Sequence, residues 1–100
     1  MIVYVSGPIK DNPTAREDFD AACIFVRSCG HTAINPFDLS DLKPDAGYQK
    51  WMRDDIAALV ACDAIYLMTG WENSAGARVE FLVAQACGLK IIFSTHWGEL

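Results

Sequence analysis

The sequence predicts an α/β fold, because short apolar segments typical of strands alternate with segments of helical periodicity along its 100 residues. Each pair of successive strands is separated by a predicted helix or a long connection, which favours right-handed crossovers and a parallel sheet with helices on both faces. With four strands we expect the order 2-1-3-4, in a three-layer flavodoxin-like or Rossmann-like sandwich. A chain of this length fits a single domain over residues 1–100.

The first half of the chain contains two predicted strands and one helix. Ile2–Ser6 is a short run rich in β-branched residues, typical of a buried strand. Thr14 precedes a helix, and Glu17 follows three residues later in the pattern of a capping box. Thr32–Asn35 is a brief second strand, after which residues 37–47 form a polar loop.

The second half contains two helices and two strands. A helix is predicted over Tyr48–Ala61, and Ala64–Met68 is a strand whose continuous apolar character indicates that both its faces are covered. A third helix opens at Ser74 or Ala75, and Lys90–Ser94 is the last strand.

The expected strand order reverses between the first and third strands, and ligands of such sheets bind beyond the carboxyl ends of the strands at this reversal. The segments after these two strands therefore line the predicted crevice. Among the aromatic residues that could stack on a base or sugar (Tyr4, Trp51, Trp71 and Trp97), only Trp71 lies on a crevice loop. We expect ligand contacts from Ser6, Gly7, Pro8, Gly70, Trp71, Ser74 and Gly76.

Glu80 is the main candidate for chemistry. It lies about one and a half turns into the third predicted helix, among the apolar residues Val79, Phe81 and Leu82. Helical side chains tilt toward the amino end of their helix, so Glu80 should lean toward the crevice, where Gly76 leaves room for a ligand. A semi-buried carboxylate there is a candidate nucleophile or general base, and a solvated surface glutamate is the alternative.

Ser74 is predicted to begin the same helix as its N-cap. The free N–H groups and positive dipole end of a helix amino terminus also favour a phosphate or carboxylate ligand. Both roles are compatible with one serine.

Composition and charge exclude several classes of protein. The net charge of −5 argues against a nucleic-acid polymer or an anionic membrane as the main partner. No apolar run approaches the roughly 18–20 residues of a membrane helix, and the start has no basic signal-peptide region, so we expect a cytoplasmic protein. The four cysteines (Cys23, Cys29, Cys62 and Cys87) show no C-x-x-C spacing, and we expect them to be reduced core residues.

Common cofactor and catalytic motifs are missing from the sequence. No G-x-G-x-x-G, Walker A, H-E-x-x-H or G-x-S-x-G pattern occurs. This weakens the case for a dinucleotide oxidoreductase, a P-loop NTPase, a zinc protease or an α/β-hydrolase, and we expect neither a cofactor nor a metal.

Two segments, IVYVSGPI and DDIAALVACDAIYLMTGWENSAGARVEFLVAQACGLKIIF, together with the element order, carry a family resemblance. The most specific part is S-x-G-x-x-x-E followed by A-x-x-x-G-L-K. The chain resembles the nucleoside 2-deoxyribosyltransferase family, and most closely its short branch, common in phages and prophages.

The resemblance implies that Glu80 attacks the anomeric carbon of the sugar and that Ser74 contacts a 5′-phosphate. It also matches Asp55 and Asp63 to a recurring aspartate pair, with Asp55 holding the sugar or protonating the departing base. Arg78 departs from the small residue frequent in the family, and could pair with Glu80, bind a substrate phosphate or fill the pocket.

The expected function is therefore cleavage or transfer at the N-glycosidic bond of a nucleoside or nucleoside 5′-monophosphate, with Glu80 and Asp55 as catalytic residues. The alternatives are a nucleotide-binding module without turnover and an NAD-type glycohydrolase. The expected partner is a small nucleoside or nucleotide. We also expect a homodimer or higher homo-oligomer, because a small domain with 52% hydrophobic residues, including Trp97 near its end, would hide apolar surface against a copy of itself.

Overall fold

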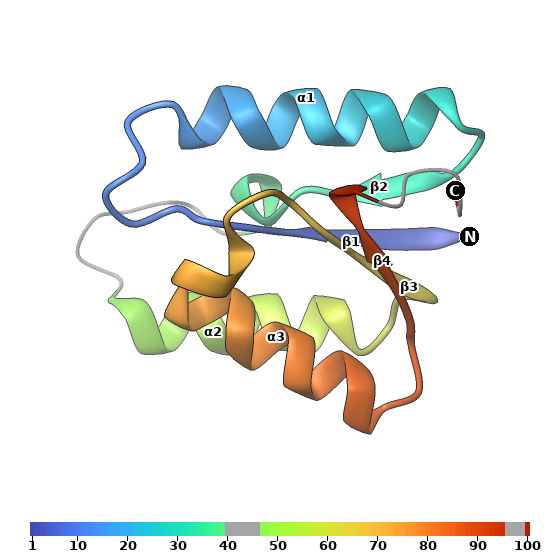
Figure 1. The fold of residues 1–100 in the computed structure, drawn as a ribbon. Coiled ribbons are helices and arrows are strands. Elements are labelled where there is room, and N and C mark those ends of the chain that lie inside the picture. The colour runs from blue at the N-terminus through green and yellow to red at the C-terminus, as the bar shows by residue number, and fades with distance from the viewer. Residues whose placement is uncertain (40–46, 96–99) are drawn as a thin grey trace.

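The four strands form one parallel sheet in the order β2-β1-β3-β4, in a computed structural model that describes residues 1–39, 47–95 and 100 (Figure 1). The strands are β1 (Ile2–Ser6), β2 (Thr32–Ile34), β3 (Ala64–Leu67) and β4 (Lys90–Phe93). In the register, Val3 of β1 lies between Ala33 of β2 and Ala64 of β3. The predicted fold class and strand order are confirmed.

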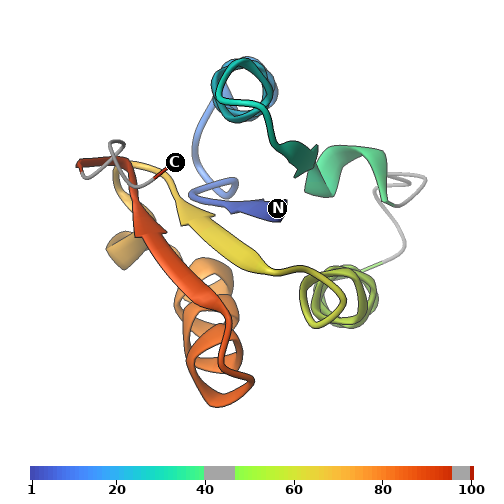
Figure 2. The ribbon, with the colours of Figure 1, turned by 90° about the vertical axis from the view of Figure 1, so that its right-hand side faces the viewer.

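The helices cover both faces of the sheet and complete three layers (Figure 2). Helix α1 (Ala15–Ser28) lies on one face, and α2 (Tyr48–Leu59) and α3 (Ala75–Ala86) lie on the other. Two short 3-10 turns, η1 (Pro36–Asp38) and η2 (Trp71–Asn73), follow β2 and β3. The second of these gives a defined shape to the loop predicted after the third strand.

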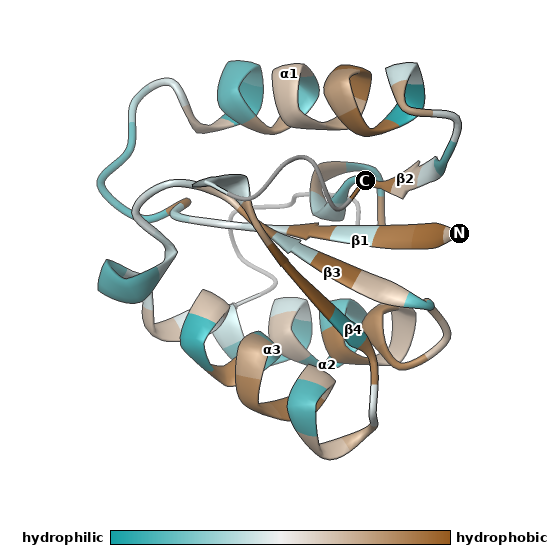
Figure 3. Cartoon of the chain, turned by 45° about the vertical axis from the view of Figure 1, so that its right-hand side comes forward, coloured by the Kyte–Doolittle hydropathy of each residue, from teal (hydrophilic) through white to brown (hydrophobic). Residues whose placement is uncertain are grey.

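The alternation of side chains along β1 divides the core into two parts. Val3 and Val5 are fully buried against α1, where they pack with Phe19 and Val26. Tyr4 faces the other way and packs under α2 and α3. Because side chains of a strand alternate between faces, Ser6 shares the face of Tyr4. Figure 3 shows how the apolar residues concentrate along the strands.

The predicted capping box at the start of α1 is wrong. Thr14 is the N-cap residue, but its backbone (φ −107°, ψ 20°) is not extended as in most N-caps, and its side chain does not cap the helix. Its hydroxyl instead contacts Asn12 Oδ1 at 3.2 Å and Asp18 Oδ2 at 3.1 Å.

The prediction for the cysteines holds for two of the four. Cys23 and Cys62 are buried, whereas Cys29 and Cys87 are exposed. Both exposed cysteines are C-cap residues, where α1 and α3 end at the surface. All four thiols are free.

Parts of the sequence-based predictions fall outside the described residues. The polar loop predicted over residues 37–47 is described only at its two ends, and Trp97 lies outside the description altogether. Within the described ranges, no helix has the length and apolar character needed to cross a membrane.

Candidate functional site

Glu80 is buried beneath the sheet, with 5% of its surface exposed. It belongs to the side of α3 that faces the sheet, together with the small residues Ala77 and Ala84. These positions are three and four residues apart, so they lie on one helical face. The arrangement excludes a solvated surface glutamate and agrees with the inward position predicted from the sequence.

Two hydroxyl groups from β1 hold the Glu80 carboxylate. The Tyr4 hydroxyl donates to Oε2 at 2.5 Å, and the Ser6 hydroxyl donates to Oε1 at 2.7 Å. Both donors come from the same face of β1, two residues apart, and Ser6 is the last residue of the strand. Each oxygen of the carboxylate thus has a buried donor, which fixes its position.

Burial raises the pKa of Glu80 to about 7, even though the hydrogen bonds from Tyr4 and Ser6 lower it and only the charge of Asp55 adds to the increase. A carboxyl group with this pKa exists in both protonation states near neutral pH. It can therefore act as a nucleophile or base when ionised.

Asp55 brings a second buried carboxyl group to the same place from α2, with 9% of its surface exposed. Burial raises its pKa to about 6, with a smaller contribution from the charge of Asp54, while a hydrogen bond from Tyr4 lowers it. Burial, followed by the charges of Glu80 and Asp55, raises the pKa of Tyr4, so its phenol stays protonated. The single phenol proton of Tyr4 is donated to Glu80 Oε2, and Asp55 lies close enough for the same hydroxyl group to affect its pKa.

Ser74 is the N-cap of α3, as predicted. Its backbone is extended, and its hydroxyl oxygen accepts a hydrogen bond from the Ala77 N–H at 3.3 Å. Ser74 therefore fixes the first turn of the helix that carries Glu80.

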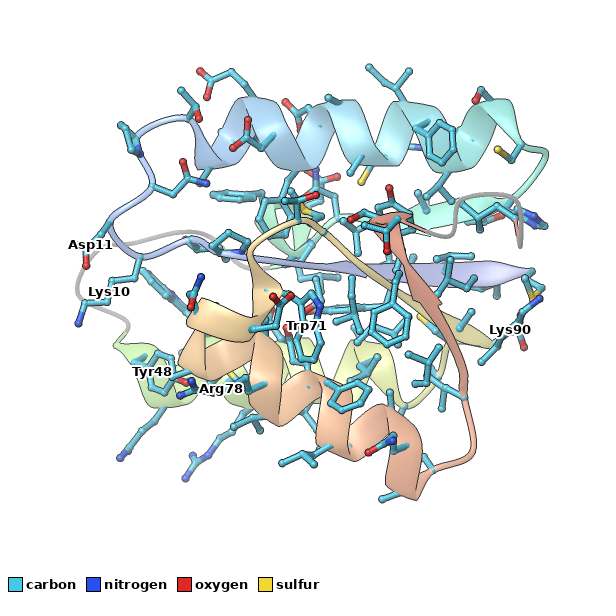
Figure 4. The ribbon with its side chains drawn as sticks, in the orientation of Figure 1. Lys10, Asp11, Tyr48, Trp71, Arg78 and Lys90 are labelled. Atoms are coloured by element: carbon cyan, nitrogen blue, oxygen red, sulfur yellow. The ribbon has the colours of Figure 1, made fainter. Side chains whose placement is uncertain are left out.

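Arg78 does not pair with Glu80. Its side chain is exposed, and Nη1 donates to the backbone carbonyl of Glu72 at 3.2 Å. In Figure 4, Arg78 and Tyr48 both lie at the end of the molecule where α3 and α2 begin. The first of the three roles considered for Arg78 is therefore excluded.

The expectation that Gly76 leaves open space beside Glu80 needs correction. A Cβ atom added at Gly76 would lie 3.4 Å from Met52 Sδ and 3.6 Å from the Tyr48 hydroxyl oxygen, both on α2. Gly76 thus allows α2 and α3 to approach closely, and α2 side chains occupy the space beside it.

The loops after β1 and β3 meet, as the predicted crevice requires. A Cβ atom at Gly7 would lie 2.8 Å from both Cβ and Sδ of Met68, so only glycine fits there without movement. Gly70 adopts a left-handed backbone (φ 87°), and its Cβ position is 3.6 Å from Pro8 Cγ.

Among the described residues, two surface depressions border the end of β3, and neither includes Glu80 or Asp55 in its lining. The larger, of about 420 Å³, is lined by Leu67, Thr69, Gly70, Trp71, Glu72, Phe93, Ser94 and Thr95. The smaller, of about 310 Å³, includes Pro8 and lies toward α1. The ring of Trp71 packs against two phenylalanine rings on the β4 side of α3. The distance between ring centroids is 4.9 Å to Phe81 and 6.0 Å to Phe93.

The structure therefore divides the predicted site residues. Ser6, Asp55 and Glu80 gather under the sheet, and Ser74 lies at the start of the helix that carries Glu80. Gly70, Trp71 and Pro8 line the depressions instead. Asp63 does not join Asp55, because its Oδ2 accepts the Ile2 N–H at 2.7 Å, at the amino ends of the strands.

Sequence reasoning missed the role of Tyr4, which it treated only as a possible stacking or core residue. The alternation of β1, which places Tyr4 and Ser6 on one face, is the signal that could have identified it. It also missed Trp51, whose buried indole Nε1–H has no hydrogen-bond partner within the described part of the chain.

No group of three or more histidine, cysteine, aspartate or glutamate side chains in the described ranges could hold a metal ion.

Comparisons with known proteins agree with the fold. A family model described as "Domain of unknown function (DUF4406)" matches residues 1–93, and no curated protein matches the sequence. A 2-deoxyribosyltransferase from Bacillus psychrosaccharolyticus has a similar structure, with a TM-score of 0.72 and 15% identity over 93% of this chain and 71% of that one.

Two further solved structures share the fold. A 2-desoxiribosyltransferase from Leishmania mexicana has a TM-score of 0.70 and 20% identity, over 92% of this chain and 62% of that chain. The CMP N-glycosidase BcmB from Clostridium botulinum has a TM-score of 0.63 and 19% identity, over 93% of this chain and 67% of that chain. The resemblance stated from the sequence is thus confirmed for the fold, and the chain belongs to the DUF4406 family.

Proposed function

We propose that this protein cleaves or transfers at the N-glycosidic bond of a nucleoside or nucleoside 5′-monophosphate, with Glu80 as the nucleophile. The observation that carries the proposal is the buried Glu80 carboxylate, held by the hydroxyls of Tyr4 and Ser6. The proteins with similar folds support it, since they are named as 2-deoxyribosyltransferases and a CMP N-glycosidase.

The proposed reaction begins with ionised Glu80. Its carboxylate attacks the anomeric carbon as the bond to the base breaks, which stabilises or traps the oxocarbenium-like sugar. The electron pair of the broken bond goes to the base nitrogen, and Asp55 supplies a proton to the departing base. This step uses the minority of molecules in which Glu80 is ionised while Asp55 is protonated, because the pKa of Asp55, about 6, lies below that of Glu80, about 7. Water then releases the sugar by hydrolysis, or a second base takes it by transfer.

Tyr4 and Ser6 act in this scheme by positioning Glu80. Their hydrogen bonds favour the ionised carboxylate, while burial opposes it, so that the pKa of Glu80 is about 7. Ser6 was predicted to contact substrate, and its hydrogen bond to Glu80 supports an orienting role instead.

Substrate binding is proposed at the edge where β1 and β3 end. Ser74 and the amino end of α3 would anchor the phosphate or ribose, since N–H groups there favour an anion. Contacts from Gly7, Pro8, Gly70, Trp71 and Gly76 stay predictions.

The burial of Glu80 favours one alternative, a nucleotide-binding module without turnover. Both carboxylate oxygens already accept hydrogen bonds, and only 5% of the residue is exposed. Each oxygen keeps a second lone pair, but a sugar carbon can reach it only if the side chains that bury Glu80 move. The alternative predicts that ligands raise the melting temperature without product formation, and that the Glu80→Gln variant retains this effect.

Release of free base from a panel of nucleosides, deoxynucleosides and their 5′-monophosphates tests the proposed reaction. We expect release by the wild type and almost complete loss in Glu80→Ala and Glu80→Gln. Glu17→Gln, which changes an exposed glutamate of α1, is the matched control and should keep full activity. The proposal is wrong if the wild type releases no base from the panel, or if Glu80→Ala is as active as the wild type.

Self-association stays a prediction as well. Large apolar side chains are exposed at the end of α2 and along α3, among them Val60 (48%), Val79 (44%) and Leu82 (61%). A mass measurement in solution should find a dimer or larger assembly, and a monomer at high protein concentration would contradict it.

A further inference from the structure

The indole of Trp51 carries a buried donor without an acceptor. Its Nε1–H is inaccessible to solvent and forms no hydrogen bond with any described residue. Indole nitrogen is only a donor, and nearly all buried donors in native proteins have a partner. Such an exception points to an acceptor that the described residues of the chain do not supply.

Trp51 lies beside the proposed catalytic groups. It precedes Asp55 by four residues on α2, so the two side chains lie on the same helical face, one above the other. Asp55 is buried near Tyr4 and Glu80, as its effects on their pKa values show. The indole and the Asp55 carboxyl group therefore form a donor and an acid on one side of the site.

The direction of α2 places Trp51 between Asp55 and the edge where ligands enter. In a parallel sheet the connecting helices run opposite to the strands, so α2 begins at the edge where the strands end (Figure 1). Trp51 is in the first turn of α2, one turn nearer this edge than Asp55. A molecule that reaches Asp55 from the carboxyl ends of the strands would pass the indole.

We propose that the Trp51 Nε1–H donates a hydrogen bond to the nucleobase of the substrate, at the acceptor next to the glycosidic nitrogen. This inference rests on the proposed function. Pyrimidines carry a carbonyl oxygen at that position and purines a ring nitrogen, so one donor serves both classes. Negative charge moves onto the base as the glycosidic bond breaks. The hydrogen bond becomes stronger during this process, because its acceptor gains negative charge.

The indole resonances of the wild-type protein provide the direct test. The chain has three tryptophans and therefore three indole N–H signals in a ¹⁵N-labelled sample. We expect the Trp51 proton signal to move downfield with deoxycytidine or deoxyadenosine 5′-monophosphate. Deoxyribose 5-phosphate, which lacks the base, should shift other signals and leave that of Trp51 in place. Trp51→Phe assigns the signal, and backbone connectivities assign it if that variant does not fold.

Affinity measurements give a second readout. Trp51→Phe keeps an aromatic ring but loses the donor, and should weaken binding of both monophosphates roughly 3- to 10-fold, as expected for one neutral hydrogen bond. It should leave the affinity for deoxyribose 5-phosphate unchanged. Phe25→Leu is the control, because it also shortens a half-buried aromatic side chain, but one on α1, on the other face of the sheet. It should change none of these affinities.

The outcomes separate this inference from the proposed function. If the monophosphates shift other signals but not that of Trp51, or if deoxyribose 5-phosphate shifts it equally, the assignment of Trp51 to the base is wrong while the ligand class stands. If no monophosphate or nucleoside shifts any signal or releases base, both the ligand class and the role of Trp51 are overturned.

Discussion

Replacing Tyr4 with phenylalanine tests how the fold sets the ionisation of Glu80. The change removes the hydroxyl that donates to Oε2 at 2.5 Å and leaves the ring in the core. Because a hydrogen bond to a carboxylate favours its ionised form, the loss of this bond raises the pKa. We expect the pKa of Glu80 to rise above its value of about 7.

The size of the increase follows from the energy of the lost bond. A hydrogen bond to a charged group contributes about 1.5–3 kcal/mol, and one pKa unit corresponds to about 1.4 kcal/mol. The pKa of Glu80 should therefore increase by about 1 to 2 units. At neutral pH the ionised fraction would fall from about half to roughly a tenth or less, and the rate of base release should fall with it.

Carbon-detected NMR of the glutamate carboxyl groups measures this pKa directly, and Glu80→Gln identifies the signal. The pH profile of base release should move to higher pH by the same amount. Tyr66→Phe removes the hydroxyl of a second buried tyrosine, which packs on the α1 side of the sheet, and should change neither readout. An unchanged or lower pKa of Glu80 in Tyr4→Phe would refute the reasoning.

Three further predictions concern stability and charge. Burial raises the pKa of Glu80 to about 7, so the folded protein keeps a proton that the unfolded chain releases. The free energy of unfolding should therefore fall as pH rises from about 4.5 to about 7, and less so in Glu80→Gln; urea titrations that show the same slope in both proteins would contradict this. Gly7→Ala should lower the free energy of unfolding by about 1–3 kcal/mol, because its Cβ would meet Met68 at 2.8 Å, and an unchanged urea midpoint would argue against this contact. Arg78→Ala should leave the pKa of Glu80 unchanged in an NMR titration, because the guanidinium donates to the Glu72 carbonyl, and an increase of about one unit would show that its charge reaches Glu80.

The sequence was sufficient to predict the fold because the signals for its elements are local. The apolar runs, the helical spacing and the alternation of strands and helices predict the observed parallel sheet of order β2-β1-β3-β4. The inward position of Glu80 was predictable for the same reason, since its neighbours on α3 are small or apolar.

The details of the site depend on contacts that are distant in sequence. Tyr4 and Glu80 are 76 residues apart, and no local pattern indicates that their side chains meet. Gly76 shows the same difficulty, because a small residue can leave space for a ligand or admit a neighbouring helix. Here Met52 and Tyr48 of α2 occupy that space.

Side-chain contacts explain the local structure at two motifs in the sequence. Thr14 has the sequence of an N-cap, but its hydroxyl contacts Asn12 and Asp18 instead of a backbone N–H. Asp63 has the spacing from Asp55 that the family resemblance suggests. Its carboxylate instead accepts the Ile2 N–H at the amino ends of the strands, where this hydrogen bond joins β1 to the start of β3.

The central claim is that Glu80 forms a covalent bond to the sugar, and mass spectrometry of the protein during turnover tests it most directly. Wild-type protein mixed with a deoxynucleoside 5′-monophosphate and quenched with acid should gain the mass of one deoxyribosyl phosphate group. After proteolysis this group should be found on the peptide that contains Glu80, and Glu80→Gln should acquire none. Release of free base that leaves no adduct on Glu80, and that continues undiminished in Glu80→Gln, would contradict the account.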